Sequence, residues 1–309
     1  MIIVGATNNY SEASISIPVK VITDLESCTW DMISEISASG NASNIFSIGD
    51  RKKIVLDGTI GTLTLSNYET YVYIIGFDHT NGTAGTDYGI HFGTFKDADG
   101  KDICLDSNYS SYAIDGSKYF NMNHWGNYNY GGWRGCDMRY DILGSTDVVP
   151  SGYGSTPTKG RTGYDATTTC ATNPVANTLM AALSKDLRDV LKPMIKYTDN
   201  TAGVSNTPEH VTATIDYLPL LSEFEVNGGQ SQANNFEQNN QTQYDYFING
   251  NSKRKYRYST FVNTLSFGGW QLRSPSWANY SYFCAVSQQG NYMQQQAATS
   301  ICIAPIFKV

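Results

Sequence analysis

Residues 268–275 read GGWQLRSP and open the part of the chain that decides the fold. Two further apolar stretches follow, FCAV at residues 283–286 and ICIAPIF at residues 301–307. The residues between these stretches are mostly polar or aromatic, and residues 274–307 contain no charged side chain. Short apolar runs separated by turn-forming residues are typical of buried strands. The pattern therefore predicts strands that frame a polar and aromatic, hairpin-like segment.

The uncharged segment has the composition of a recognition surface. Tyr and Trp side chains offer large contact areas at low entropic cost, and Asn, Ser and Gln supply adaptable hydrogen bonds. An uncharged surface is also dehydrated at a smaller cost than a charged one. We expect residues 276–300 to bind a ligand; the alternative is a solvated polar loop. The predicted ligand-binding residues are Trp277, Asn279, Tyr280, Tyr282, Ala285, Ser287, Gln289, Asn291, Tyr292, Gln294 and Gln296.

Other side chains of this segment are predicted to be structural. Trp270, Leu272, Pro275, Phe283 and Val286 are expected in the core. Successive side chains of a strand point to opposite faces. Phe283 and Val286 therefore require a bulge or a turn between them if both are to point inward.

Arg273 and two cysteines each allow two interpretations. Arg273 either pairs with a buried carboxylate, which we favour, or acts as a cation in the binding site. Cys284 and Cys302 either form a disulfide or are free thiols in adjacent strands, and the second is favoured because free cysteine is often buried. None of the six cysteines has the C-x-x-C spacing of a zinc or thioredoxin-like site.

The composition of the whole chain argues against several classes of protein. Of its 309 residues, 40% are hydrophobic, which suffices for a sizeable core, and 16% are charged, against roughly 25% in ordinary domains. The net charge of −7 argues against a nucleic-acid binder, which needs clustered Lys and Arg. No basic amphipathic helix and no apolar run long enough to span a bilayer is found. Residues 1–10 lack the features of a secretory signal, so export would follow another route, such as virion release.

The order of elements predicts a single compact α+β domain at residues 26–309, with helices beside mixed or antiparallel strands. Residues 1–25 are expected to form an N-terminal arm or an edge strand, because their apolar residues alternate at period two. A regular βαβα alternation is absent, which argues against a doubly wound sheet.

Local signals place the individual elements. Thr29 is a predicted N-cap of a helix that ends near Gly40, and Ser184 of another. A helical stretch is expected from Gly131 to about Leu143. Strands are predicted at residues 53–56, 62–66 and 71–77. Long loops are predicted at residues 144–173 and 227–260.

No motif indicates a catalytic residue, a metal or a cofactor. Asp78 and His79 follow a predicted strand and are expected to hydrogen-bond locally, with a metal site as the alternative. Residues 97–102 resemble the start of a calcium loop, but Asn108 occupies the position where that loop needs Glu, so a turn is expected. No phosphate-binding, dinucleotide or nucleophile-elbow motif occurs.

Several motifs in a fixed order carry a resemblance to a known family. The stretch W-x-L-R-S-P at residues 270–275 is similar to a signature of a large domain family in gut Firmicutes and their viruses. The resemblance covers roughly residues 26–309. The matching upstream features are residues 46–50, residues 75–79, Gly131-Gly132-Trp133, Met138-Arg139, Leu187, Lys196, residues 216–222 and Glu225, and the downstream ones are Phe283-Cys284, Val286, Gly290-Asn291 and residues 303–305.

The resemblance implies a C-type-lectin-like fold with a C-terminal variable segment, here residues 276–300. Some members are diversified by retroelements that rewrite adenine-containing codons, often those of Asn. Gln288, Gln289 and residues 294–296 depart from this pattern, because an Asn codon altered only at its adenines does not encode Gln.

The expected function is non-enzymatic binding of a protein or glycan receptor on a bacterial surface. The location would be a phage tail or a bacterial cell surface, and the chain could act as a homo-oligomer or a tail subunit. One alternative is an oxidase like the formylglycine-generating enzymes, which share the fold and need a reactive cysteine pair such as Cys284 and Cys302. The other is a structural tail or adhesin module.

Overall fold

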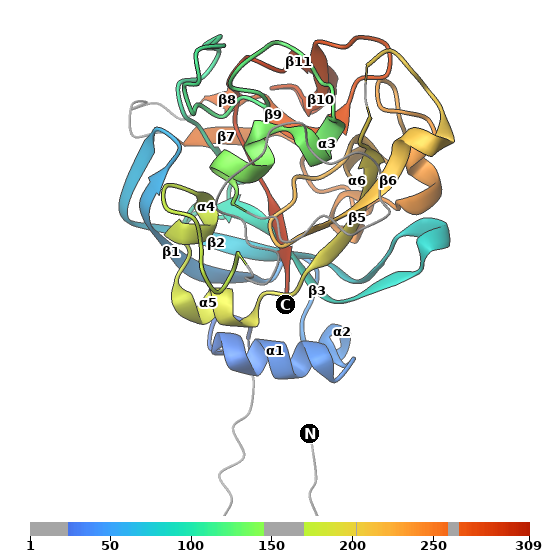
Figure 1. Cartoon of the computed structure of the whole chain (residues 1–309). Coiled ribbons are helices and arrows are strands. Elements are labelled where there is room, and N and C mark those ends of the chain that lie inside the picture. The colour runs from blue at the N-terminus through green and yellow to red at the C-terminus, as the bar shows by residue number, and fades with distance from the viewer. Residues whose placement is uncertain (1–23, 145–169, 202, 259–265) are drawn as a thin grey trace, which may run out of the picture.

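The computed structural model describes residues 24–144, 170–201, 203–258 and 266–309. The predicted N-terminal arm and most of the loop predicted at residues 144–173 lie outside these residues. Within them the chain forms several antiparallel sheets and short helices, which confirms the α+β class. Figure 1 shows the N-terminal helix at one end of the molecule and the strands of the predicted binding segment at the other.

The first helices lie where their capping signals predict. Helix α1 spans Trp30–Ala38, and the Thr29 hydroxyl accepts a hydrogen bond from the Met32 N–H at 3.3 Å. Trp30 and Ile33 are buried, and the Trp30 ring makes edge contacts with Phe92 and Phe307. Helix α2, Ala42–Ile45, follows.

A four-stranded antiparallel sheet, ordered β1-β2-β3-β12, forms the base of the fold. Its strands are β1 (Arg51–Ile60), β2 (Leu63–Thr80), β3 (Thr86–Lys96) and β12 (Ile306–Lys308). The strands predicted at residues 53–77 are confirmed, although the last two form one continuous strand, β2. Phe307 of β12 pairs with Phe92 of β3. The last strand of the chain therefore forms one edge of a sheet whose other three strands are the first three in the sequence.

A second sheet carries the predicted binding segment. It is ordered β11-β10-β9, with β9 at Trp270–Pro275, β10 at Tyr282–Val286 and β11 at Tyr292–Gln296. Phe283 and Val286 are both fully buried, but in different core clusters on the two faces of β10. The sheet thus lies between two cores, so Phe283 and Val286 are buried on opposite faces of a regular β10, without the bulge that burial on one face would require. The register shift beside Phe283 lies in β9, because Pro275 pairs with Phe283 and Gln271 pairs with Ala285.

The remaining elements are short. The predicted helical stretch after Gly131 is confirmed as α3 (Gly132–Gly135) followed by a π-helical turn, η2 (Met138–Ile142). The others are η1 (Gly82–Ala84), β4 (Ile103–Leu105), α4 (Leu179–Ala182), α5 (Lys185–Val190), β5 (Met194–Asp199), η3 (Pro208–His210), β6 (Val211–Asp216), α6 (Glu223–Asn227), η4 (Glu237–Asn240), α7 (Asp245–Ile248), β7 (Lys255–Tyr258) and β8 (Phe267–Gly268).

The prediction that residues 227–260 are loop-like is only partly right. Helix α7 and strand β7 lie within this range, and Tyr244, Tyr246 and Phe247 are buried. These side chains are buried through tertiary contacts, such as the stacking of the Tyr244 ring on His79 at 3.6 Å. The mostly polar sequence around them gives no sign of that burial.

Two buried ion networks fix the elements behind the binding segment. Arg273 of β9 pairs with Glu225 of α6, whose other carboxylate oxygen lies 2.9 Å from the Lys196 Nζ of β5. All three side chains are completely buried, so the structural interpretation of Arg273 is confirmed.

The second network has the same character. Asp216 accepts hydrogen bonds from the Trp133 indole at 3.1 Å and from the Arg139 Nε at 2.6 Å. Arg139 and Asp216 are also fully buried. Motifs that are far apart in the sequence therefore meet in two buried polar clusters.

Candidate recognition surface

A tight turn joins β10 to β11. The Ser287 N–H donates to the Asn291 carbonyl at 2.9 Å, and the Gly290 N–H donates to the Ser287 carbonyl at 2.9 Å. Gly290 has a φ of +84°, which glycine adopts without strain. The Ser287 hydroxyl also accepts from the Asn291 N–H at 3.1 Å. The turn is therefore ordered, with the exposed side chains of Gln288 and Gln289 at its tip.

Strand β11 is the edge strand of its sheet, since it pairs with β10 on one side and ends the strand order. Tyr292 is 43% exposed, and the following residues to Gln296 are partly exposed on both faces. Strand β10, by contrast, is buried from Phe283 to Val286. The sheet thus presents one accessible strand on a rigid, buried support.

The loop between β9 and β10 is held by one buried side chain. The Asn129 Nδ2 donates to the carbonyls of Ser276 at 2.9 Å, Asn279 at 3.1 Å and Tyr282 at 2.9 Å. The backbone N–H of Asn129 donates to the Tyr280 carbonyl at 2.6 Å. Asn129 therefore attaches the segment around it to the predicted binding loop.

This attachment places further aromatic residues beside the predicted surface. Trp125 is 60% exposed, Tyr130 is 56% exposed, and Tyr130 stacks with Tyr280 at a ring-centroid distance of 6.1 Å. Neither Trp125 nor Tyr130 was among the predicted binding residues. The signal was present, because residues 119–133 are as free of Asp, Glu, Lys and Arg as residues 274–307.

A second loop supports the other side of the surface. The buried Glu223 carboxylate accepts from the backbone N–H groups of Ser231, Gln232 and Ala233, at 3.0, 3.0 and 2.8 Å. In this loop, the Gln232 carbonyl accepts a hydrogen bond from the backbone N–H of Trp277 at 3.0 Å. The anchored loop is therefore joined to the loop between β9 and β10, in which the Trp277 side chain is partly buried.

The structure places the predicted binding residues in three states. Tyr280, Gln289, Asn291 and Tyr292 are exposed. The partly buried residues are Trp277, Asn279, Tyr282, Ser287, Gln294 and Gln296.

Ala285 is 1% exposed, so its prediction as a ligand contact is wrong. Its methyl group packs inside because both faces of β10 are covered. Gln294 is also engaged internally, since its Nε2 donates to the Ser276 hydroxyl at 2.8 Å.

The two exposed tyrosines among the predicted binding residues have different neighbours. Tyr280 stacks with Tyr130. Tyr292 instead lies close to Gly229, since a Cβ added to that glycine would be 3.1 Å from the Tyr292 hydroxyl. The surface therefore extends from the Tyr130 side, across the hairpin, to the loop after α6.

The two cysteines of this segment lie on opposite sides of β9. Cys284 belongs to β10, which pairs with one edge of β9, while the Cys302 carbonyl accepts from the Gln271 N–H at the other edge, at 2.8 Å. Strands two positions apart in a sheet are about 10 Å apart, too far for a disulfide. Both thiols are free, as expected, but they are not in adjacent strands.

The thiols also lack the environment of a reactive pair. Burial raises the pKa of both Cys284 and Cys302 well above the usual range. The nucleophilic form of cysteine is the thiolate, which a raised pKa suppresses.

The candidate metal residues have structural partners. Asp78 accepts from the Gly89 N–H at 2.8 Å, and His79 stacks on Tyr244. The turn predicted at residues 97–102 is confirmed by the bond from the Lys101 N–H to the Asp97 carboxylate at 2.8 Å. Within the part of the chain that the structure describes, no group of His, Cys, Asp and Glu could hold a metal ion.

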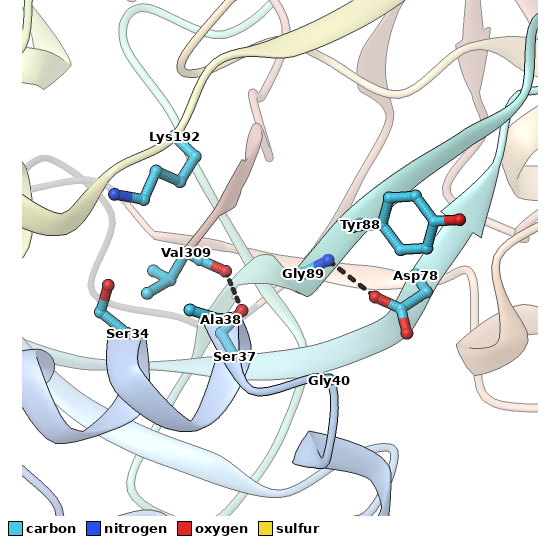
Figure 2. A pocket seen from close by; sticks show the side chains of 9 residues that line it. All are labelled: Ser34, Ser37, Ala38, Gly40, Asp78, Tyr88, Gly89, Lys192 and Val309. Carbon is cyan, nitrogen blue, oxygen red and sulfur yellow. Dashed lines mark hydrogen bonds between the residues drawn. The ribbon is translucent and has the colours of Figure 1, made fainter.

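A cavity of about 260 Å³ lies at the opposite end, beside α1. Figure 2 shows that Ser37 bonds to Val309 and Asp78 to Gly89, so these polar groups already have partners in the protein. Lys192 stands across the cavity from them. The hydrogen bond from Ser37 of α1 to Val309, the residue after β12, holds the helix against the end of that strand.

Comparison with known proteins identifies one family. A sequence model described as "Domain of unknown function (DUF6273)" matches residues 110–309, well over half of the chain. The match includes Asn129, both uncharged stretches and the hairpin. No curated protein and no solved structure matches the chain. No helix in residues 24–144, 170–201, 203–258 or 266–309 is long and apolar enough to cross a bilayer.

Proposed function

The chain belongs to the DUF6273 family, and from this premise we propose that it is a non-enzymatic binding protein whose recognition surface is built on the β10–β11 hairpin. The surface consists of the loop at residues 276–281 with the adjacent Tyr128 and Tyr130, the turn at residues 287–291 and the exposed side of β11. The partner is a protein or glycan receptor on a bacterial surface.

One observation carries this proposal, namely the contrast between neighbouring parts of the same segment. Trp270, Leu272, Phe283 and Val286 are completely buried, while the residues that connect their strands reach solvent. Substitutions at exposed positions typically change stability by about 0.5 kcal/mol or less. A surface of this kind can change its sequence, and hence its ligand, without loss of the fold.

The same contrast supports a C-type-lectin-like arrangement with a variable C-terminal segment. Arg273, Glu225 and Lys196 bind the strand before the variable segment to two other elements, and this anchoring resists rearrangement. We place the protein on a phage tail or a bacterial cell surface, where a diversified receptor-binding protein would act. The raised thiol pKa values favour binding over the oxidase alternative.

Binding to intact cells of gut Firmicutes, measured by flow cytometry with the labelled full chain, tests the proposal. Tyr292→Ala should weaken binding by ~1–4 kcal/mol, as the loss of a hot-spot aromatic does. Because Tyr292 is 43% exposed, the melting temperature should change little.

Tyr88→Ala is the matched control. Tyr88 is 74% exposed on β3, beside the cavity at the far end of the molecule. The proposal is wrong if Tyr292→Ala leaves binding to the cells unchanged, or if Tyr88→Ala weakens binding as much as Tyr292→Ala does.

A further inference from the structure

Three tyrosines from two distant segments form a row on the recognition surface. The Tyr128 and Tyr130 ring centroids are 5.8 Å apart, and those of Tyr130 and Tyr280 are 6.1 Å apart. The ring planes differ by 29° in the first pair and 6° in the second. We call Tyr128, Tyr130 and Tyr280 the tyrosine row.

The rings of the row reach solvent. Tyr130 and Tyr280 are 56% and 50% exposed, and Tyr128 is partly exposed. Because the two centroid spacings of 5.8 and 6.1 Å are nearly equal, exposed aromatic rings recur at regular spacing.

The row is rigid because its backbone is fixed. The Asn129 side chain bonds three carbonyls of the opposite loop, and its Oδ1 accepts from the Gly203 N–H at 3.0 Å. Trp125, which is also exposed, lies against the glycine at position 116, where a Cβ would meet the ring at 2.4 Å. Fixed aromatic residues lose little entropy when they bind.

Oriented amide groups flank the row. The Asn127 Oδ1 accepts from the Ala298 N–H at 3.3 Å, and the Asn279 Oδ1 accepts from the Ser281 N–H at 3.0 Å. These bonds fix both carboxamides and leave each Nδ2 group without a partner among the described residues. Nδ2 groups are hydrogen-bond donors, which suit the oxygen atoms of hydroxyl groups.

Charge narrows the class of ligand further. Residues 119–133 and 274–307 together contain no Asp, Glu, Lys or Arg, and His124, the histidine in these stretches, is buried. An anionic polymer such as a nucleic acid would gain no ion pair from these two stretches. A cation that contacts them, Arg254, lies at the β10–β11 turn, where its Nε donates to the Gln288 carbonyl at 3.1 Å. A buried charge on the ligand would also lose hydration without compensation.

We propose that the tyrosine row binds an uncharged saccharide chain. A pyranose ring presents a face of C–H groups, which packs on an aromatic ring, and a rim of hydroxyl groups, which the amides of Asn127 and Asn279 reach. Successive sugar units then lie over successive rings. This inference rests on the proposed function and names the chemical class of its ligand.

Isothermal titration with neutral oligosaccharides tests it directly. The probes are cello-, xylo-, manno- and chito-oligosaccharides of increasing length, with heparin as the charged comparison. At least one neutral series should bind, more tightly as the chain lengthens, and heparin should not. Tyr130→Ala and Tyr280→Ala should each weaken that binding about tenfold.

Conservative and distant variants separate stacking from folding. Tyr130→Phe keeps the ring and should retain the affinity of the unaltered protein, whereas Tyr88→Ala should have no effect. All variants should keep their melting temperature. The inference is overturned if no neutral oligosaccharide binds, or if Tyr130→Ala binds as well as Tyr130→Phe.

Treated cells distinguish failure of this inference from failure of the proposed function. Periodate destroys cell-surface glycans and should abolish binding, whereas protease treatment should leave it intact. Binding that survives periodate and is lost to protease identifies a protein partner, which overturns the saccharide inference while the proposed function stands. If untreated cells bind the protein and its Tyr292→Ala variant equally, the proposed function fails instead.

Discussion

At the scale of single residues, buried charges stabilise this fold only as a set. Glu225 lies between Arg273 and Lys196, and all three side chains have no exposed surface. Glu225→Gln would leave two buried cations without an anion. We expect the free energy of unfolding to fall by ~3–5 kcal/mol, as when one partner of a buried pair is removed. Urea denaturation measures this change, with Glu69→Gln as the control.

Glu69 also pairs with a lysine, Lys53, at 3.0 Å, but both side chains are largely exposed. Exposed ion pairs contribute about 0–1 kcal/mol, so the control should change stability little. Equal effects of the two substitutions would contradict the structural role assigned to Glu225.

At the scale of elements, the β10–β11 hairpin has a fixed alternation of backbone bonds. The Ser287 N–H donates to the Asn291 carbonyl, and the Ala297 N–H donates to the Ser281 carbonyl. The alternation of an antiparallel ladder then directs the backbone N–H groups of Met293 and Gln295 toward β10. The amides of Tyr292 and Gln294 then point to the open edge. Hydrogen exchange should therefore be slow at Met293 and Gln295 and fast at Tyr292 and Gln294.

Gly290→Ala should reduce this protection, because a side chain at a φ of +84° costs ~1–2 kcal/mol. Gln289→Ala, in the same turn, serves as the control and should leave the pattern unchanged. Uniform exchange along β11 in the unaltered protein would show that the pairing register is wrong.

At the scale of the whole molecule, buried titratable groups couple stability to pH. Burial, together with the nearby positive charge of Lys196, lowers the pKa of His79 and of His91 from 6.5 to about 3. Burial raises the pKa of Glu237 from 4.5 to about 7. Below pH 6.5 the unfolded chain gains a proton at each histidine and the folded protein does not, so stability falls. Glu237 acts in the opposite sense between pH 7 and pH 4.5, because there only the folded protein holds its proton.

Two groups against one leave a net loss of stability on acidification. Asp106, whose pKa burial raises from 3.8 to about 6, acts in the same sense as Glu237 and offsets the loss below pH 6. Between pH 6.5 and pH 6, the free energy of unfolding should therefore fall at a rate of about 1.4 kcal/mol per pH unit. Urea midpoints measured across this window test the slope. Replacing both histidines by Gln should reverse its sign, whatever stability is lost in total; an unchanged slope would contradict the assignment.

The sequence by itself determined the features that depend on neighbouring residues. Thr29 caps α1, Ser184 precedes α5, and the alternation in β9 buries Trp270 and Leu272, because capping and side-chain periodicity act over a few positions. The exposed tip of the hairpin at Gln289 was predictable for the same reason. These local rules are sufficient for the α+β class and for most of the candidate surface.

Only the tertiary structure decided which distant segments meet. The position of Asn129 under the loop of Tyr280, the tyrosine row that results, and the separation of Cys284 from Cys302 all depend on how strands pair. Ala285 was misplaced because β10 is covered on both faces, and its own alternation is the same whether one face or two are buried. Pairing over long range is chosen by the total burial of the folded chain, which no short stretch of sequence encodes.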